Sequence, residues 1–325
     1  MSDPFESDPI LVEMVRSGFV ESVHHGRVAV TNPDGSLAAS LGAALAPMYP
    51  RSSSKPLQAI GMVRAGLDLD GELLALACAS HSGEDFHLDG VRRILALSGL
   101  DESVLQNTPD YPLDEVAREE WLRAGHGKTS LTMNCSGKHA AMIRTTVCNG
   151  WPLDTYRDPD HPVQLAILQT IDDLTGELAS HVAVDGCGAP LSAVTLYGVA
   201  RAFGRIAVST EGAEAKVAAA IRQHPQWVSG TRRDELALHR AIPGSVVKAG
   251  AEAVCAIGLP DGRGVAVKVS DGNPRARAVL MAGVLQRLGF DHPTLTELAS
   301  TPVLGHGEPV GEIRPVVGRL EKWDV

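Results

Sequence analysis

The sequence predicts a protein of the α/β (α+β) class, with a central antiparallel sheet, flanking helices and a helical subdomain. Short β segments fill the first 45 residues, and a second β pattern begins at about residue 245. Between these two stretches, apolar residues recur mostly at helical spacing. We therefore expect a single domain over residues 1–325, with its sheet built from about 10–50 and 245–325 and a mostly helical part at about 51–244.

The charge of the chain narrows the range of partners. With 44% hydrophobic and 21% charged residues, the composition is that of a globular protein. The net charge is −10 and the basic residues are scattered, which argues against nucleic acid or an anionic membrane as a partner. Small uncharged or cationic ligands remain compatible with this charge.

The sequence also indicates a cellular compartment. Residues 1–9 are acidic and polar, unlike a secretory signal, and no apolar run approaches the roughly 20 residues of a membrane span. The five cysteines are odd in number and widely spaced, which suits reduced thiols better than a disulfide framework. We expect a cytoplasmic protein without a membrane partner.

The first elements form a predicted antiparallel hairpin. Phe19–Val23 and Arg27–Thr31 are rich in apolar and β-branched residues, and the turn sequence Asn-Pro-Asp-Gly follows at residues 32–35. The chain then returns through Leu37–Leu41, where the β pattern resumes. This order of strand, turn and strand is typical of a hairpin.

A Ser-x-x-Lys pattern follows, at Ser52 and Lys55. Apolar residues at Leu57, Ile60 and Val63 mark one buried helix face, so the serine and the lysine lie about where a helix begins. Residues three apart on a helix have Cβ atoms roughly 5–6 Å from each other, which lets an amine take the proton of an attacking hydroxyl. By itself the pattern also fits a helix cap followed by a surface lysine.

Helices account for most of the middle of the chain. The clearest begins at Asp160-His161-Pro162, carries apolar residues on one face and ends at Gly176. By the same signals we expect helices at Asp70–Ala79, 86–99, Leu113–Ala124, 193–208, 211–224 and from Thr231 to Ala241.

Polar segments between these helices are candidates for a site. Cys-Ala-Ser-His-Ser-Gly-Glu at 78–84 consists either of cap and turn residues or of site residues. Gly137 opens a helix of small residues whose N–H groups could hold a carboxylate or an oxyanion, while the missing glycine spacing excludes a phosphate-binding loop. A short strand at His181–Val184 ends in a turn whose Gly186 and Gly188 permit close backbone approach.

The last third returns to β structure. Ser245–Gly250 and Ala251–Leu259 lead through the turn at Pro260–Arg263 into Gly264–Val269, which predicts a hairpin. Asn273–Gly289 then reads as a capped helix with a core-facing apolar side.

Several of these segments together resemble the L-asparaginase II family of the Rhizobium etli inducible type, within the serine β-lactamase, penicillin-binding and glutaminase-like architecture. The matching blocks follow the order of the family and span most of the chain. They are Arg-Ser-Ser-Ser-Lys-Pro at 51–56, the block at 78–84, Asn-Cys-Ser-Gly-Lys-His at 134–139, Asp-Gly-Cys-Gly at 185–188, the Lys-x-Gly strand at 248–250 and Lys-Val-Ser-Asp-Gly at 268–272.

The resemblance implies an amidohydrolase that cleaves L-asparagine to L-aspartate and ammonia. It implies two serine–lysine pairs, Ser52 with Lys55 and Ser80 with Lys248, and a homodimer. The middle motif of penicillin-recognising enzymes has no convincing counterpart, and Lys248-Ala-Gly lacks the Ser or Thr that often follows that lysine. Both departures argue against penicillin binding.

The same resemblance implies a zinc site near the substrate and no organic cofactor. Cys135, Lys138 and Cys187 are the implied ligands, although lysine must be neutral to coordinate and two packed thiols are the alternative interpretation. The residues expected to bind substrate are Arg51, His81, Asn134, His139, Asp185, Gly186 and Asp271.

A lysine that acts as a base at neutral pH must lose roughly 3 pKa units, which burial and a neighbouring cation can provide. We expect Ser52 to be the nucleophile because Lys55 is its fixed helical neighbour. The opposite assignment, Ser80 attacking with Lys248, fits the sequence nearly as well.

Three other functions stay open. A glutaminase would differ by one methylene in its substrate, which a pocket distinguishes by only about 1–3 kcal/mol. A penicillin- or peptidoglycan-recognising protein would share the architecture, but no signal or anchor is evident. A zinc- or redox-sensing protein built on Cys135 and Cys187 would leave the Ser-x-x-Lys helix unexplained.

Overall fold

A computed structural model describes residues 8–325 except 317, 319, 321–322 and 324–325. The chain divides into two compact units. The first consists of residues 1–53, 194–208 and 237–325, and the second of residues 54–193 and 209–236. The first unit therefore draws on both ends of the chain.

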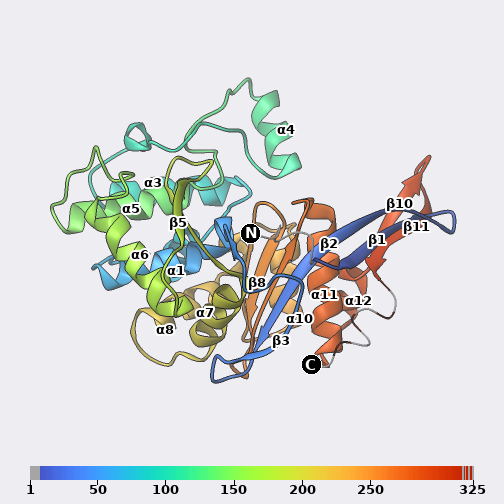
Figure 1. Ribbon diagram of the computed structural model, residues 1–325. Coiled ribbons are helices and arrows are strands. Elements are labelled where there is room, and N and C mark those ends of the chain that lie inside the picture. Colours follow the sequence, from blue (N-terminus) through green and yellow to red (C-terminus); the bar gives the residue numbers. More distant parts are fainter. Residues whose placement is uncertain (1–7, 317, 319, 321–322, 324–325) are drawn as a thin grey trace. The chain divides into compact units, whose positions relative to one another are not determined.

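The first unit is organised around an antiparallel sheet, which is eight-stranded among the described residues (Figure 1). Its path is β10-β11-β1-β2-β9-β8-β7, with β3 paired to β2. The strands are β1 (Ile10–Arg16), β2 (Phe19–Thr31), β3 (Leu37–Leu41), β7 (Val246–Gly250), β8 (Val254–Gly258), β9 (Gly264–Val269), β10 (Thr301–Gly305) and β11 (Glu308–Pro315). The predicted α+β class with a central antiparallel sheet is confirmed.

Strands from the two ends of the chain meet in the middle of this sheet. β2 pairs with β9, with Gly26 opposite Val269 and Val30 opposite Val265. β7, β8 and β9 are rich in valine and alanine, with Lys248 and Lys268 as their charged residues, and nearly all of their residues are buried. Such continuous apolar runs are expected of strands that are covered on both faces.

Two helices cover these strands. Figure 1 shows α7 (Leu196–Val208) and α11 (Arg277–Arg287) on opposite sides of β8. The apolar core on the α11 side contains Val265 and Val267 but not Ala266, as the alternation of side chains along a strand requires. The predicted helix over 193–208 begins at Leu196, because the residues before it pair as β6 (Pro190–Thr195).

The second unit is mostly helical, as the apolar spacing predicts. α1 packs against α6, and α2 packs against both α5 and α8. Its helices are α1 (Lys55–Arg64), α2 (Gly71–Ala77), α3 (Asp85–Ala96), α4 (Glu115–Arg123), α5 (Ser136–Cys148), α6 (Pro162–Thr175), α8 (Gly212–Gln223), α9 (Pro225–Val228) and the start of α10 (Asp234–Ala241). The strand β5 (His181–Val184) pairs with the first residues of β6.

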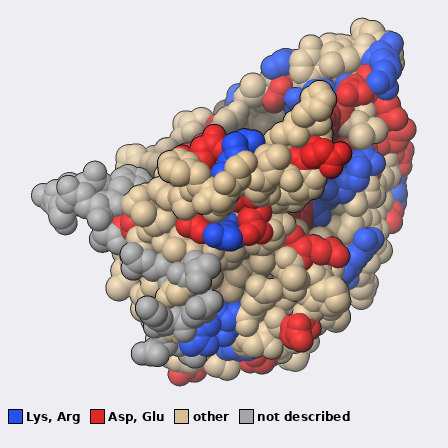
Figure 2. Space-filling view, turned by 90° about the vertical axis from the view of Figure 1, so that its right-hand side faces the viewer, with Lys and Arg blue, Asp and Glu red and all other residues tan. Residues whose placement is uncertain are grey.

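Two elements near the chain end have no counterpart in the sequence-based prediction. These are α12 (Pro293–Leu298) and the β10–β11 hairpin, whose second strand pairs with β1. Among the described residues, no helix has the length and apolar character that crossing a bilayer requires. On the face shown in Figure 2, acidic and basic side chains are intermixed rather than gathered into one basic area.

Candidate active site

In the second unit, the side chain of Lys55 contacts two other residues from the predicted site blocks, Ser80 and Cys135, and the three are called the Lys55 cluster below. Lys55 is the first residue of α1 and its side chain is buried. Its Nζ atom donates to the Ala79 carbonyl oxygen at 2.5 Å, to Ser80 Oγ at 3.0 Å and to Cys135 Sγ at 3.1 Å. An amine and a hydroxyl in contact are the arrangement that activates a serine nucleophile. The sequence did not reveal this Lys55–Ser80 contact, because it assigned each residue to another partner.

Backbone hydrogen bonds hold Ser80 in place after the end of α2. The Ser80 N–H donates to the Val228 carbonyl oxygen at 3.1 Å, and the His81 N–H donates to the Asn134 carbonyl oxygen at 3.0 Å. The segment is therefore fixed on both sides. The contact with Lys55 brings Ser80 to a second predicted site residue, and the role of the segment as a site stays a prediction.

The start of α5 lies against the end of α2 because residue 137 is a glycine. A Cβ atom at Gly137 would stand 2.6 Å from the Leu76 carbonyl oxygen, so a larger residue would push the two helices apart. This close approach brings Cys135 and Lys138 to the segment that contains Ser80.

Three of the predicted site residues converge here. Lys138 Nζ donates to Cys187 Sγ at 3.3 Å, and Cys135 and Cys187 lie close enough for each to shift the pKa of the other. Asp185 Oδ1 accepts from the Gly186 N–H at 2.8 Å, and Asp185 Oδ2 lies 3.9 Å from Cys187 Sγ. Residues far apart in the sequence thus form one buried group of two sulfurs and one amine.

The charges in this group follow from burial and from the interaction between the two sulfurs. Interaction with Cys135 lowers the pKa of Cys187 far below its ordinary value, with the Lys138 charge adding to the effect. The same interaction, together with burial, raises the pKa of Cys135. Burial alone would lower the pKa of Lys138, but the charges on Cys187, Cys135 and Asp185 outweigh it and raise that pKa. These directions favour a thiolate at Cys187, a thiol at Cys135 and an ammonium at Lys138.

This donor set is chemically compatible with zinc. Two sulfurs and a lysine nitrogen converge, and thiolates are preferred zinc ligands. Binding would require Cys135 and Lys138 to release their protons, as metal binding by protonated ligands generally does. Within the described part of the chain, no group of three or more His, Cys, Asp or Glu side chains is placed to hold a metal ion.

Two buried histidines beside this group are neutral. Burial lowers the pKa of His139 to about 4, and its Nδ1 atom lies 2.9 Å from the Tyr156 hydroxyl. Burial also lowers the pKa of His81 well below its ordinary value, with the His87 and Lys55 charges adding to the effect. His81 Nε2 lies 2.7 Å from the Ser136 hydroxyl, which itself donates to the Leu131 carbonyl oxygen, so this nitrogen carries the proton.

Asn134 borders the same group. Its side-chain Oδ1 accepts from Cys135 Sγ at 3.1 Å, and its carbonyl oxygen accepts from His81. The structure thus gives His81, Asn134 and His139 partners within the protein. Their expected roles in substrate binding stay predictions.

In the first unit, Ser52 lies against the end of β7. A Cβ atom at Gly250 would stand 2.8 Å from the Pro50 carbonyl oxygen and 3.2 Å from the Ser52 nitrogen, so only glycine fits there. Lys248 is fully buried, and its Nζ atom donates to the Ala249 carbonyl oxygen at 2.7 Å. Because residues two apart share a face of a strand, Lys248 points to the side on which Gly250 meets the serine.

The block at 268–272 reaches the same end of the sheet. Arg51 forms a 3.7 Å ion pair with Glu252, and a Cβ atom at Gly272 would stand 2.3 Å from the same carboxylate. Asp271 accepts from His24 Nδ1 at 2.6 Å and from the Asn273 N–H at 2.9 Å. Both carboxylate oxygens of Asp271 thus accept hydrogen bonds from within the protein. The expected role of Asp271 in substrate binding stays a prediction.

The four predicted catalytic residues fall in different units. Ser52 and Lys248 belong to the first unit, and Lys55 and Ser80 to the second. The pairs expected from the sequence, Ser52 with Lys55 and Ser80 with Lys248, each join the two units and stay predictions.

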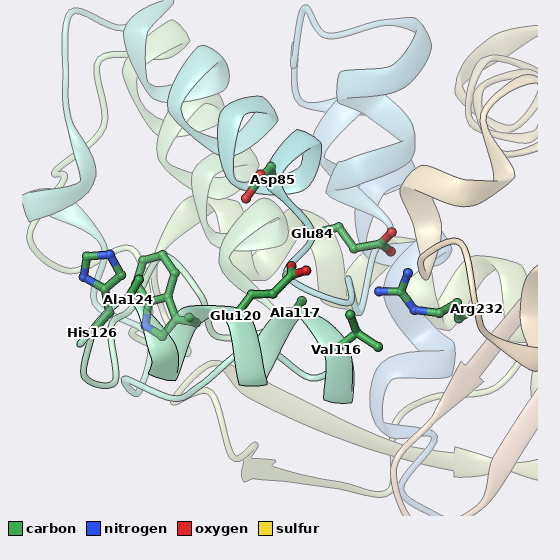
Figure 3. A pocket seen from close by; sticks show the side chains of 10 residues that line it. Glu84, Asp85, Val116, Ala117, Glu120, Ala124, His126 and Arg232 are labelled. Atoms are coloured by element: carbon green, nitrogen blue, oxygen red, sulfur yellow. The ribbon is translucent and has the colours of Figure 1, made fainter.

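A cavity of about 440 Å³ lies elsewhere in the second unit (Figure 3). It is lined by Glu84, Asp85 and Glu120, with Trp121 and Arg232 beside them. None of the residues predicted for catalysis, substrate binding or metal binding lines it. The cavity is therefore separate from the Lys55 cluster.

Comparison with known proteins gives one match that covers nearly the whole chain. The family model described as L-asparaginase II matches residues 12–315. No curated protein sequence matches the chain. The resemblance drawn from the sequence blocks therefore agrees with the family match.

Solved structures show only distant likeness. A β-lactamase from Mycobacterium bovis is 15% identical, with a TM-score of 0.41, over 76% of this chain and 88% of its own. A putative β-lactamase from Bacteroides dorei is also 15% identical, with a TM-score of 0.41, over 75% of this chain and 84% of its own. A Bacillus glutaminase is 13% identical, with a TM-score of 0.37, over 82% of this chain and 91% of its own.

Proposed function

The chain belongs to the L-asparaginase II family, and on that premise we propose that it is an amidohydrolase that cleaves L-asparagine to L-aspartate and ammonia. The observation that supports a mechanism is the 3.0 Å contact between Lys55 Nζ and Ser80 Oγ. Both side chains are buried, and a second contact holds the lysine on the carbonyl oxygen of Ala79. The two heavy atoms are already at hydrogen-bond distance, so Lys55 needs only to lose a proton for the contact to reverse and the Ser80 hydroxyl to donate to the amine.

In the proposed reaction, neutral Lys55 takes the proton of the Ser80 hydroxyl while the serine oxygen attacks the side-chain amide carbon of asparagine. The C–N bond then breaks, and the nitrogen leaves as ammonia with the proton that Lys55 returns. Water next attacks the aspartyl ester, which releases aspartate and restores the serine hydroxyl. Each step is that of acyl transfer with a lysine as general acid and base.

The alternative nucleophile is Ser52, which the sequence favoured. Its support is the close contact of its backbone with Gly250 and the position of Lys248 on the same face of β7. In that reading, Lys55 or Lys248 accepts the proton, and a protonated lysine stabilises the oxyanion. Single substitutions at the two serines distinguish these readings.

We also propose that Cys135, Cys187 and Lys138 hold a zinc ion. When bound, such an ion supplies a Lewis acid that can orient and polarise an oxygen of the substrate. In the absence of metal, Lys138 Nζ donates to Cys187 Sγ and Lys55 Nζ donates to Cys135 Sγ, so an amine contacts each sulfur. The homodimer and the cytoplasmic location inferred from the sequence stay predictions.

The test is ammonia release from L-asparagine, L-glutamine and buffer alone, measured in parallel on one preparation. We expect release from asparagine at a kcat/KM at least about tenfold above that for glutamine, which corresponds to about 1.4 kcal/mol in transition-state binding. Equal or faster release from glutamine would assign the chain as a glutaminase. Release from neither would refute the proposed function.

A further inference from the structure

Residues 230–235 lie along the segment that carries Ser80. The Thr231 N–H and hydroxyl donate to the two carboxylate oxygens of Glu84, at 2.9 Å and 2.6 Å. Arg233 Nη1 donates to the carbonyl oxygen of Ser80 at 3.2 Å. The two segments are thus joined at two points, where Thr231 contacts Glu84 and where Arg233 contacts Ser80.

The guanidinium of Arg233 is itself fixed. Its Nη2 atom lies 2.9 Å from Glu235 Oε2, and the Glu235 side chain is 1% exposed while that of Arg233 is 19% exposed. A planar guanidinium paired with a buried carboxylate has little rotational freedom, and the carboxylate neutralises its charge. Arg233 is therefore better suited to holding a neutral carbonyl than to capturing a charged substrate group.

The hydrogen bond from Arg233 to the Ser80 carbonyl oxygen is one of three that hold the backbone of Ser80 and the amine of Lys55 in place. The backbone of Ser80 is held by Val228 through its N–H and by Arg233 through its carbonyl oxygen. Lys55 is held by the carbonyl oxygen of the preceding residue, Ala79. Because a displacement of about 1 Å in a reacting group can cost about 100-fold in rate, the carbonyl anchor bears directly on the serine–lysine contact.

We propose that Arg233, held by Glu235, is a positioning residue for Ser80. The inference rests on the proposed function, in which Ser80 is the nucleophile. Arg233 does not touch the reacting atoms in this role, so its loss changes the rate of the chemical step and leaves substrate affinity unchanged. A role in binding the substrate carboxylate would have the opposite signature, a raised KM with little change in kcat.

The chain supplies a matched control in the next residue. Arg232 Nε donates to Asp114 at 3.0 Å, and the Arg232 side chain lines the cavity of Figure 3, to whose lining Ser80 does not contribute. Arg232→Lys and Arg233→Lys each retain the positive charge but replace a planar guanidinium in the same loop by an ammonium. Only the second removes the bond to Ser80.

The experiment compares these two variants and Glu235→Gln with the wild type in two assays, after thermal unfolding has shown which are folded. The first is steady-state hydrolysis of asparagine. The second is the rate at which a serine-reactive fluorophosphonate labels the peptide containing Ser80, followed by mass spectrometry. The labelling assay does not depend on the natural substrate, so it stays informative if ammonia release fails.

We expect Arg233→Lys to lower both kcat and the labelling rate at Ser80 at least about tenfold, with KM within threefold of wild type. Glu235→Gln should fall between wild type and Arg233→Lys, and Arg232→Lys should match wild type. In Arg233→Ala, added guanidinium ion should restore part of the labelling rate. Wild-type rates in Arg233→Lys, an effect confined to KM, or an equal loss in Arg232→Lys would overturn the proposal. If Arg233→Lys is unfolded, labelling of Glu235→Gln at the wild-type rate would overturn it as well.

Discussion

Lys55 Nζ contacts both Ala79 and Ser80, at 2.5 Å from the carbonyl oxygen of the first and 3.0 Å from the hydroxyl of the second. One buried amine therefore binds two consecutive residues of the segment after α2. Its third contact, with Cys135, links the same amine to the thiol pair. A change at Lys55 thus acts on the candidate nucleophile and on the proposed metal ligands together.

The first prediction concerns the nucleophile. Ser80→Ala removes the hydroxyl that Lys55 contacts, so we expect kcat/KM for asparagine to fall by at least about 1,000-fold in a folded protein, as measured by ammonia release. Ser52→Ala serves as the comparison, since it removes a hydroxyl from the other unit. If Ser80→Ala keeps more than about a tenth of the activity while Ser52→Ala loses it, the nucleophile is Ser52.

The second prediction concerns the close packing of β7 on the Ser52 turn. Gly250→Ala places a Cβ atom 2.8 Å from the Pro50 carbonyl oxygen, so the turn must move. We expect the free energy of unfolding to fall by about 1–3 kcal/mol in urea titrations, together with a loss of activity. Gly127→Ala is the control because a Cβ atom there meets nothing within 4 Å. Equal free energies of unfolding for the two variants would show that the turn can move without destabilising the protein.

The third prediction is a pH dependence of stability. Burial lowers the pKa of His87 from 6.5 to about 4 in the folded protein, so between these values the unfolded chain binds a proton that the folded chain does not. Stability is therefore complete above pH 6.5 and declines as the pH falls toward 4, by about 3 kcal/mol at most for this residue.

His87→Gln tests this assignment. The variant lacks the titrating ring, so its free energy of unfolding should decline less steeply between pH 6.5 and 4 than that of the wild type. His81 and His139 remain in the variant and are shifted in the same direction, which leaves a residual slope. Parallel wild-type and variant curves over this pH range would contradict the role of His87.

The fourth prediction concerns the thiol pair. Cys187→Ser removes the thiolate, and we expect the purified variant to bind zinc at least about tenfold more weakly than the wild type in a competition titration with a chromophoric chelator. Cys148→Ser, which alters the exposed cysteine, should bind as the wild type does. Undiminished zinc affinity in Cys187→Ser would remove this residue from the proposed ligand set.

Sequence reasoning succeeded where local patterns decide the structure. The apolar residues after Lys55 place the start of α1, and the apolar runs near Val265 indicate strands. It also selected Cys135, Lys138 and Cys187, which the fold brings together. Their proximity depends on tertiary packing, but each lies in a block that carries a recognisable composition.

The partner of Lys55 could not be predicted in the same way. A Ser-x-x-Lys spacing suggests the serine one helical turn away, whereas the observed contact depends on how the start of α1 lies against the segment after α2. Arg233 was missed because it lies in none of the matching sequence blocks. Its contact is with a backbone oxygen, which every residue has, so the sequence does not mark the partner. The β10–β11 hairpin was missed because Pro302 and Gly305 weaken the strand pattern.

The order of strands in the sheet has a consequence for synthesis on the ribosome. Val12 pairs with Pro315, and Gly26 pairs with Val269, so β1 and β2 lie between strands that are translated much later than they are. A nascent chain that ends before β9 can form the β1–β2 hairpin but exposes both of its long edges, which are templates for aggregation. Such non-local pairing also slows folding because loop closure precedes any gain from the contacts. The sheet is therefore complete only after residue 315 has been synthesised, and until then the edges of the hairpin lack the strands that pair with them.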